Sequence, residues 1–541
     1  MKTVSLTALL TLACSVSGVA AQHVQFSLNR GIPGLRLGSP SPLSRRQAYT
    51  EILANNITGG LYFIDVEVGT PGQTVTLALD TGSSDAWLVA PNADLCTSKA
   101  LQGYYADSCS PTYNYKKSSS YKLVRTSGFQ IQYLDGSVAS GDYISDNFSI
   151  GDVTIKSLQM GYATETVRGT GILGIGFSAN EATTKTYPNL IDELFNQGLI
   201  GSKAYSLYLN DRRSDAGNIL LGGIDTDKYI GKLDVLPIVT DPVFGEDTST
   251  GPSAFVVGLS GMSLEYTNGS NVEIISPRIK SSYPAILDSG TTLTYLPDYL
   301  AQQIFDKFGA VTDARKRGTG LTLIDCELLN AEPDLIMTFR FGNSTAGQST
   351  IDVPIWEMVL DILQGYEDLL PSNLPWDHAC LFGIQSTGPF ESSGSVTNGN
   401  FALLGETFLR SAYVVYDLTH VQIGMAQANL NSTTSTIVEL SAKDAGLPSP
   451  SGVKAQQQTP SSTVSSSSSS SSPTETSSLS PTSSGSSSTG TGSGSGTTTT
   501  APTAGVTSEA KNGALSRRPG SGGMWSVLAA AIFVGGTMVV L

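Results

Sequence analysis

The chain has very little histidine, and this limits the chemistry that it can carry out. Its 541 residues include only His23, His378 and His420. None of the three lies in a metal-binding pattern such as His-Glu-x-x-His. The shortage weighs against catalysis by a histidine-activated serine or cysteine and against a zinc site. We therefore expect no metal ion and no other cofactor.

Charged residues are also scarce, and positive charge is in the minority. They make up 14% of the chain, with 31 Lys and Arg against 46 Asp and Glu, which gives a formal net charge of -15. No stripe of basic residues is visible along the sequence. This pattern argues against a nucleic-acid partner.

Long amphipathic segments are few. Stretches rich in Val, Ile, Leu, Tyr and Thr alternate with Gly, Ser and Asn turns, which predicts a mostly β protein. Helices are predicted at 188–198 and 300–308 from their apolar spacing. The region of about 380 residues that has this character is too long for one compact core. We therefore expect two β lobes with a cleft between them.

Two short triads stand in matching surroundings far apart in the chain. Asp80-Thr81-Gly82 follows the apolar segment 77–79, and Asp288-Ser289-Gly290 follows the apolar segment 285–287. Each triad precedes two small hydroxyl residues and, soon after, another apolar run. Repetition over such a distance indicates duplication of a whole lobe.

Paired carboxyl groups suit the activation of a water molecule. Two carboxyls about 3 Å apart cannot both ionise, so they share a proton and place an acid beside a base. Asp80 and Asp288 are therefore the candidate catalytic residues. The neighbouring hydroxyls can fix the geometry, and the glycines give the backbone freedom. These supporting residues are Thr81, Gly82, Ser83, Ser289, Gly290 and Thr291.

A single Asp-Thr-Gly or Asp-Ser-Gly is more often a turn than a catalytic group. Two copies in matching frames are harder to dismiss, and here the chain resembles the pepsin-like aspartic endopeptidases over about 47–430. Trp87 matches the family tryptophan that supports a hairpin called the flap, and Tyr133 matches the flap tyrosine. Most relatives have glycine after that tyrosine, whereas this chain has Leu134. The resemblance implies two pseudo-symmetric lobes and a lid over the substrate.

Asp135, in the same hairpin, has two interpretations. Acidic residues near the cleaved bond favour substrates with Lys or Arg there, and such a preference is found in the yapsin group, which this chain resembles. The Asp-Gly pair is also a frequent hairpin turn. The sequence favours the two interpretations of Asp135 about equally. Tyr133 also has a second interpretation, as an ordinary aromatic residue of a strand.

The ends of the chain predict a secreted precursor. Residues 1–21 read as a signal peptide. The cationic segment 22–46 ends in Arg45-Arg46, which we interpret as a propeptide cleaved after Arg46. The expected lobes are 47–238, with the first aspartate, and 239–430, with the second.

Four cysteines remain once the signal peptide, which contains Cys14, is removed. Two lie in each expected lobe, and an oxidising compartment favours disulfides. Three pairings are possible; we prefer one bond per lobe, which agrees with the second-lobe bridge of the family. The residues are Cys96, Cys109, Cys326 and Cys380. N-glycosylation acceptors, by pattern, are Asn56, Asn147, Asn268, Asn343 and Asn431.

The C-terminal region differs in composition. Residues 431–512 are expected to form a disordered, O-glycosylated stalk, because Ser, Thr, Gly and Pro dominate much of it. Residues 513–541 end in an apolar run, which reads either as a transmembrane helix or as a removed glycosylphosphatidylinositol (GPI) signal. We favour the GPI signal, with attachment at Asn512, because no cytoplasmic residues follow and Arg517-Arg518 violates the positive-inside rule.

These observations predict a fungal, GPI-anchored aspartic endopeptidase of the yapsin-like group. We expect a monomer at the outer face of the plasma membrane or in the wall, acting on surface proteins or peptides. The alternative is a catalytically silent surface protein that uses the two lobes for peptide binding or adhesion.

Overall fold

The computed structural model describes residues 24–30, as backbone only, and residues 61–456 with short gaps at 106, 110, 215–216, 240–250, 267–268, 276–281, 315–319, 331–334, 344–346, 365–369 and 394–398. The predicted signal peptide, Arg46, Asn512, most of the stalk and the GPI signal lie outside these residues. The described part is mostly β, as expected. Within it, no helix is long and apolar enough to cross a membrane.

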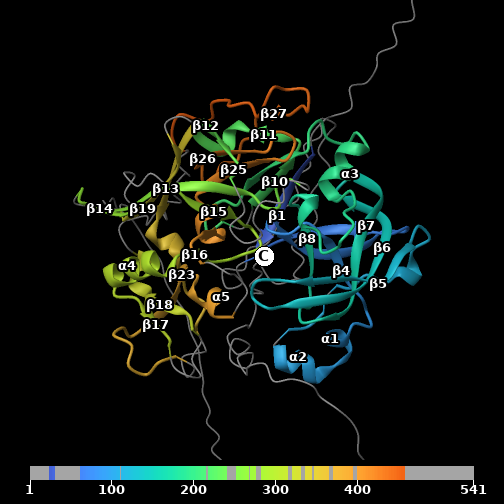
Figure 1. The fold of residues 1–541 in the computed structure, drawn as a ribbon, viewed down its shortest axis with the longest axis horizontal. Coiled ribbons are helices and arrows are strands. Elements are labelled where there is room, and N and C mark those ends of the chain that lie inside the picture. Colours follow the sequence, from blue (N-terminus) through green and yellow to red (C-terminus); the bar gives the residue numbers. More distant parts are fainter. Residues whose placement is uncertain are drawn as a thin grey trace, which may run out of the picture. The chain divides into compact units, whose positions relative to one another are not determined.

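The largest sheet joins strands from both ends of the chain (Figure 1). In sheet order its strands are β12 (Tyr229–Pro237), β26 (Gln422–Ala428), β25 (Ala412–Asp417), β9 (Ala204–Tyr208), β10 (Gly217–Leu221), β1 (Val24–Arg30), β2 (Tyr62–Val68), β3 (Gln73–Asp80), β8 (Gly171–Gly174), β4 (Ala86–Val89), β7 (Val153–Thr166), β6 (Val138–Ile150) and β5 (Lys122–Gln132). The predicted boundary at 238/239 is therefore too simple, because β25 and β26 pair with strands of the first half.

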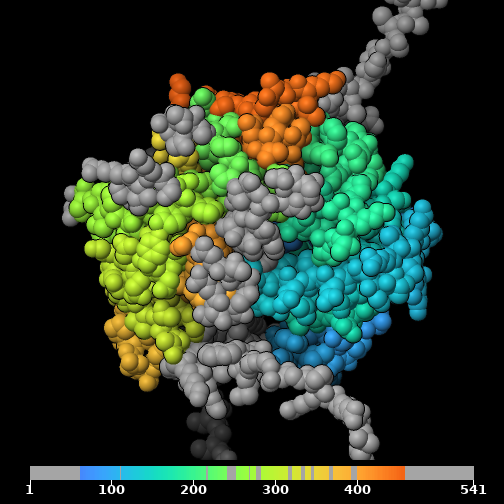
Figure 2. All heavy atoms as spheres, viewed as in Figure 1, coloured from blue at the N-terminus to red at the C-terminus, as the bar shows by residue number. Residues whose placement is uncertain are grey.

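The second half forms its own sheets. One contains β20 (Gly347–Pro354), β19 (Ile336–Asn343), β13 (Val256–Glu265), β15 (Tyr283–Leu287), β24 (Ala402–Leu404), β16 (Thr294–Leu296) and β23 (Ile384–Ser386), with β14 (Asn271–Ile275) beside β13. The other contains β17 (Val311–Thr312), β18 (Thr322–Asp325), β22 (Ala379–Phe382) and β21 (Val359–Leu360). Figure 2 shows the two halves on opposite sides of the molecule. We refer to them as the first and second lobes.

Helices are short. They are α1 (Asp94–Thr97), α2 (Lys99–Tyr105), α3 (Leu190–Asn196), α4 (Asp298–Phe308), α5 (Gly388–Ser393) and α6 (Glu406–Leu409). The two helices expected from apolar spacing are α3 and α4. A capping box between Asn189 and Asp192 starts α3, and Gly309 ends α4 in the left-handed conformation that glycine adopts without a steric penalty.

Part of the predicted propeptide belongs to the sheet. β1 pairs antiparallel with β10 on one side and with β2 on the other. It thus connects the strands β9 and β10 to the strands that lead to Asp80. Cleavage after Arg46 would separate this strand covalently from the lobe that it completes.

The folded part also extends beyond the predicted start of the stalk at 431. β27 (Ile437–Glu439) pairs with β11 (Gly223–Asp225), and Lys228 Nζ donates to the carbonyl of Ser432 at 2.7 Å. Leu440 and Leu447 are buried in an apolar cluster with strands of the large sheet. The sequence prediction missed this because only a few apolar residues mark the segment.

A protein that ends at Leu430 should accordingly be less stable than one that ends at Gln456. Burial of two leucine side chains alone contributes about 3–6 kcal/mol, at about 1.5–3 kcal/mol each. We expect a clearly lower midpoint of thermal unfolding for the shorter protein, measured with both in the same buffer. Equal midpoints would show that residues 431–456 add nothing to the fold.

Candidate active site

The two triads lie at equivalent places in the two lobes. β3 ends at Asp80 and runs parallel to β8, with Asp80 opposite Gly174. In the second lobe β15 ends just before Asp288 and runs parallel to β24, with Leu287 opposite Leu404. β4 and β16 then pair antiparallel with β8 and β24. The repeated sequence frames therefore produce a repeated local structure.

Reciprocal hydrogen bonds join the loops that carry Asp80 and Asp288, which we call the first and second catalytic loops after the predicted role of these residues. The N–H of Thr81 donates to Ser289 Oγ at 3.1 Å, and the N–H of Ser289 donates to Thr81 Oγ1 at 2.9 Å. Each hydroxyl then donates across to the other strand, Thr81 to the carbonyl of Leu287 and Ser289 to that of Leu79, both at 3.0 Å. This arrangement fixes one lobe's loop against the other's.

Each aspartate receives the same set of donors. The N–H of Gly82 donates to Asp80 Oδ1 and that of Gly290 to Asp288 Oδ1, both at 2.8 Å. Hydroxyls of Ser83 and Thr291 donate to the Oδ2 atoms.

The two carboxyl groups lie close enough for each to affect the pKa of the other. Glycine is needed at 290 for close packing: a Cβ there would lie 2.4 Å from Asp80 Oδ1.

Burial and mutual repulsion set the protonation of the pair. Both aspartates are almost fully buried. Desolvation raises the pKa of Asp80, while its hydrogen bonds oppose that shift. Desolvation and then the charge of Asp80 raise the pKa of Asp288 well above its ordinary value. The pair therefore shares one proton over a wide pH range.

The predicted flap is the hairpin of β5 and β6, with its tip at 133–137. The indole N–H of Trp87 donates to Tyr133 Oη at 2.8 Å, and both side chains are buried. Burial raises the pKa of Tyr133, and the nearby charge of Asp80 raises it further. Leu134 is buried in an apolar cluster whose other members, including Ile286 and Tyr295, all come from the second lobe. The departure from glycine thus gives the tip an apolar contact across the lobes.

Asp135 is already ion-paired in the structure. Its Oδ1 accepts the N–H of Ser137 at 2.8 Å, as a turn aspartate does, and its Oδ2 lies 2.5 Å from Arg168 Nη2. Arg168 is a residue that the sequence analysis did not identify. No local pattern marks it, because its partners lie in a hairpin more than thirty residues away.

The cysteines pair within each lobe, Cys96 with Cys109 and Cys326 with Cys380. Among the glycosylation acceptors, Asn147 and Asn431 have described side chains. Their Nδ2 atoms donate to Thr70 Oγ1 at 3.1 Å and to Asp211 Oδ2 at 2.6 Å, respectively. Asn56 and Asn268 lie outside the described residues, and only the backbone of Asn343 is described. Occupancy stays a prediction.

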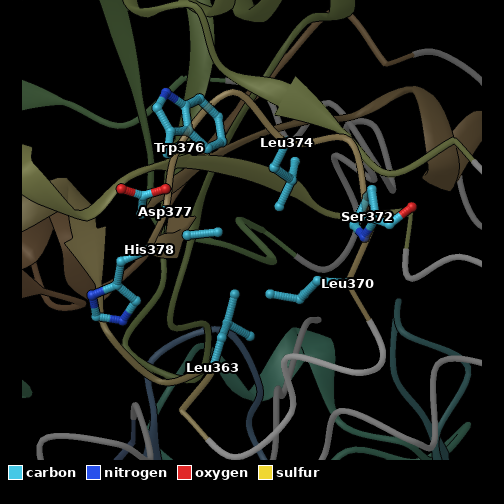
Figure 3. Close-up of a pocket in the computed structure, with 9 residues that line it drawn as sticks. Leu363, Leu370, Ser372, Leu374, Trp376, Asp377 and His378 are labelled. Atoms are coloured by element: carbon cyan, nitrogen blue, oxygen red, sulfur yellow. The ribbon is translucent and has the colours of Figure 1, made fainter.

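A pocket of about 170 Å³ lies in the second lobe, and neither Asp80 nor Asp288 lines it (Figure 3). Leu363, Leu370, Leu374 and Trp376 supply its apolar lining, and His378 lies at its side. His378 approaches Asp361 and Cys326, the one group of potential metal ligands among the described residues. Since Cys326 is bonded to Cys380 it has no thiolate, and the group does not form a metal site.

Behind the first catalytic loop lies a second set of buried acids. Asp85 accepts hydrogen bonds from the hydroxyls of Tyr143 at 2.9 Å and Tyr187 at 2.6 Å. Glu181 Oε2 accepts the N–H of Tyr187 at 2.8 Å, and burial raises the pKa of Glu181 to about 9. The carbonyl of Asp85 accepts the N–H of Gly174, so these acids contact the support of Asp80.

Glu181→Gln should make stability less dependent on pH. The folded protein keeps a proton on Glu181 up to about pH 9, whereas the unfolded chain releases it near pH 4.5, the ordinary pKa of a glutamate side chain. The folded state therefore binds more protons between these values, and stability falls as pH rises through this window. We expect equal unfolding midpoints for variant and wild type at pH 4 and a higher midpoint for the variant at pH 8. A wild-type advantage at pH 8 would contradict this account.

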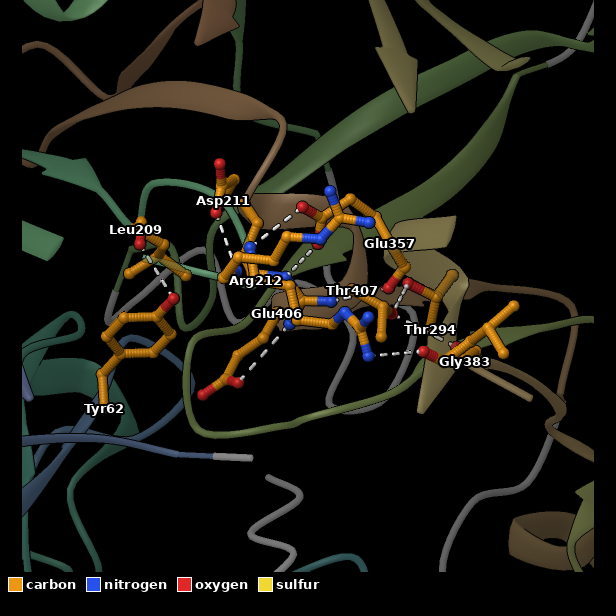
Figure 4. Close-up of polar contacts among 12 residues, drawn as sticks. Tyr62, Leu209, Asp211, Arg212, Thr294, Glu357, Gly383, Glu406 and Thr407 are labelled. Atoms are coloured by element: carbon orange, nitrogen blue, oxygen red, sulfur yellow. Dashed lines mark hydrogen bonds and ion pairs between the residues drawn. The ribbon is translucent and has the colours of Figure 1, made fainter. Parts of the chain in front are cut away.

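A buried charge network supports the second catalytic loop (Figure 4). Arg410 Nε pairs with Glu357 Oε2, and Arg410 Nη1 lies 4.0 Å from Glu406 Oε2; all three side chains are fully buried. The N–H of Arg212 donates to Glu357 Oε1 at 3.0 Å. Glu406 also donates its N–H to the carbonyl of Thr291 at 2.8 Å. This network was not predicted from the sequence, although charges within the apolar segment 401–417 were a visible signal.

Two acids held in mirrored loops of two β lobes define an aspartic peptidase. Residues 61–428 match the sequence family "Eukaryotic aspartyl protease", and the chain belongs to that family. It is an aspartic-type endopeptidase.

Known relatives are fungal. The chain is 37% identical over 395 residues, 72% of each chain, to a probable aspartic-type endopeptidase, OpsB, of Aspergillus oryzae. It is 30% identical over 485 residues, 77% of each chain, to aspartic proteinase 3 of Saccharomyces cerevisiae. Among solved structures, the aspartic proteinase of Irpex lacteus matches 70% of this chain and 97% of its own with a TM-score of 0.51. At 23% identity that likeness establishes the fold alone.

Proposed function

We propose that this endopeptidase hydrolyses peptide bonds with a water molecule activated between Asp80 and Asp288. The observation that carries the proposal is the buried carboxyl pair, in which each member accepts the same kinds of backbone and hydroxyl hydrogen bonds. Asp80, whose pKa is raised less, is the base that takes a proton from water. Asp288 is the acid that donates toward the carbonyl oxygen and later the leaving nitrogen.

The flap is the second part of this proposal. Tyr133, held by Trp87 and close to the charge of Asp80, would close over the substrate and exclude water. The purified protein should cleave a mixed peptide pool at acidic pH, and a statine inhibitor should block it. An intact pool after incubation would instead favour the silent peptide-binding or adhesive protein.

We further propose that the enzyme is secreted, belongs to the yapsin-like group and is attached through a GPI lipid at Asn512. Support comes from the predicted signal peptide, from the two disulfides and from a relative described as secreted aspartic protease 5 of Candida albicans, 32% identical over 381 residues. Its substrates would be proteins of the surface or wall, and it would act as a monomer. Phosphatidylinositol-specific phospholipase should release it from intact cells, and failure of release would argue against the lipid.

We propose that the enzyme accepts Lys or Arg next to the bond that it cleaves, and that Asp135 is the acidic group that attracts this side chain. The support is the position of Asp135 at the flap tip, where its side chain is 20% exposed. Asp135→Ala should reduce cleavage next to Lys and Arg in the peptide pool, relative to cleavage next to apolar residues. An unchanged cleavage pattern would remove Asp135 from substrate selection.

A further inference from the structure

The carboxylate of Asp135 has two partners, the backbone of its own turn and the guanidinium of Arg168. One carboxylate oxygen accepts the N–H of Ser137, and the other meets Arg168. The side chain of Arg168 is 4% exposed, whereas that of Asp135 is 20% exposed. The cation is therefore enclosed, and only the carboxylate retains access to solvent.

Arg168 is held in place by several contacts. Its Nε and Nη2 donate to Ser137 Oγ at 3.0 and 2.8 Å, and its guanidinium lies 5.7 Å from the centre of the Tyr133 ring. At the backbone, its N–H donates to Thr166 Oγ1, whose hydroxyl donates to its carbonyl. Thr166 is the last residue of β7, so the backbone of Arg168 is fixed to this strand of the first lobe while its side chain extends to the flap.

The position of Arg168 links it to the catalytic loop as well. It lies between β7 and β8, and β8 pairs with the strand that ends at Asp80. The next residue, Gly169, is fixed through its N–H to Asp107 Oδ2 at 2.7 Å, and a Cβ there would lie 2.2 Å from the carbonyl of Ser108. The backbone next to Arg168 is thus closely packed, which fixes the point from which its side chain extends.

An enclosed cation changes what the carboxylate offers to a substrate. A lysine or arginine side chain that approaches Asp135 meets an acid whose charge is already balanced, and it must share that acid with a fixed like charge. A neutral side chain of the same length meets no such repulsion. The preference for one substrate over another depends on the difference between their transition-state free energies, and this repulsion raises the free energy for the basic substrate.

We propose that Arg168 sets the substrate preference of the flap by competing, within the molecule, with basic substrate side chains for Asp135. This inference rests on the proposed function, in which Asp135 receives a Lys or Arg side chain. Arg168 is a positioning residue in this scheme, since it acts on the substrate through Asp135. Arg168 weakens the preference for Lys or Arg, which would be stronger if Asp135 acted alone.

The test compares two peptides that differ only in lysine or norleucine beside the cleaved bond. The measured quantity is the ratio of kcat/KM for lysine to kcat/KM for norleucine, at a mildly acidic pH. We expect this ratio to rise about tenfold or more in Arg168→Gln. It should not rise in the double variant Arg168→Gln with Asp135→Asn. Arg168→Lys, which keeps the positive charge, should retain a ratio close to that of the wild type.

The ratio separates this role from a purely structural one, because a poorly positioned flap would lower kcat/KM for both peptides alike. If Arg168→Gln does not fold, Ser137→Ala removes the hydroxyl that accepts two of its hydrogen bonds and should raise the ratio in the same direction. An unchanged ratio in folded Arg168→Gln, or a raised ratio that persists in the double variant, overturns the inference. No cleavage of either peptide by the wild type instead overturns the proposed function on which it rests.

Discussion

Replacement of Asp80 by Asn should abolish peptide hydrolysis while the protein stays folded. The side-chain oxygen of asparagine can still accept the N–H of Gly82, and its NH2 group can donate to the Ser83 hydroxyl, which then becomes the acceptor. The amide cannot take a proton from water, however, and the shared proton of the pair is lost. Acid–base catalysis of this kind contributes about 10²–10⁴-fold. We expect kcat to fall by at least that factor, measured with a fluorogenic peptide at acidic pH.

The matched control is Asp288→Asn, which should cause a similar loss. Because the two carboxyls act as a unit, the double variant should be no worse than either single one. Unfolding midpoints near the wild-type value would show that the losses are chemical. Substantial hydrolysis by either folded single variant would exclude the water-activation mechanism and would favour some other pair of groups.

The juxtaposition of Asp80 and Asp288 could be predicted because its signal is local and repeated. Each aspartate follows a short apolar strand, and Thr81 and Ser289, which join the loops, are the next residues in the chain. The order Asp, hydroxyl, glycine therefore contains most of the geometry. The sequence did not show why glycine is required at 290, which is the approach of Asp80 from the other lobe.

Contacts that depend on distant segments could not be predicted. Arg168 contacts Asp135 only because β7 and the flap pack together, and no sequence pattern near either residue predicts this contact. Leu134 looked like an irregularity of the flap, whereas its role depends on apolar residues of the second lobe. The predicted end of the fold at 430 was wrong partly for the same reason, since the cluster that buries Leu440 and Leu447 includes strands β9 and β12, which precede them by about two hundred residues, as well as the nearer β25 and β26.

The charge network under the second catalytic loop provides the other large expected effect. Glu357, Glu406 and Arg410 are fully buried. Desolvation alone would lower the pKa of Arg410, but the combined effect of Glu357, Tyr62 and Glu406 outweighs it and raises the pKa overall. Arg410 Nη2 also donates to the carbonyl of Glu357 at 2.6 Å. The network therefore depends on Glu357 for both charge and position.

Glu357→Gln should destabilise the fold strongly, since it leaves the buried charge of Arg410 without its closest counterion. Removing one partner of a buried pair costs about 3–5 kcal/mol, a large share of a typical total of about 5–15 kcal/mol. Urea unfolding would measure this. The control is Glu273→Gln, which breaks a solvent-exposed pair with Arg340 at 3.8 Å and should change stability by no more than about 1 kcal/mol.

The double variant Glu357→Leu with Arg410→Met separates charge from packing. It removes both ions and keeps apolar volume, so it should recover much of the stability lost in Glu357→Gln. It would still lack the bond from Arg410 to the carbonyl of Glu357, and Glu406 would lose its nearest cation. Because the N–H of Glu406 holds the carbonyl of Thr291, we expect this stable variant to remain less active than the wild type. Full recovery of activity together with stability would show that the network serves the fold alone and does not position Asp288.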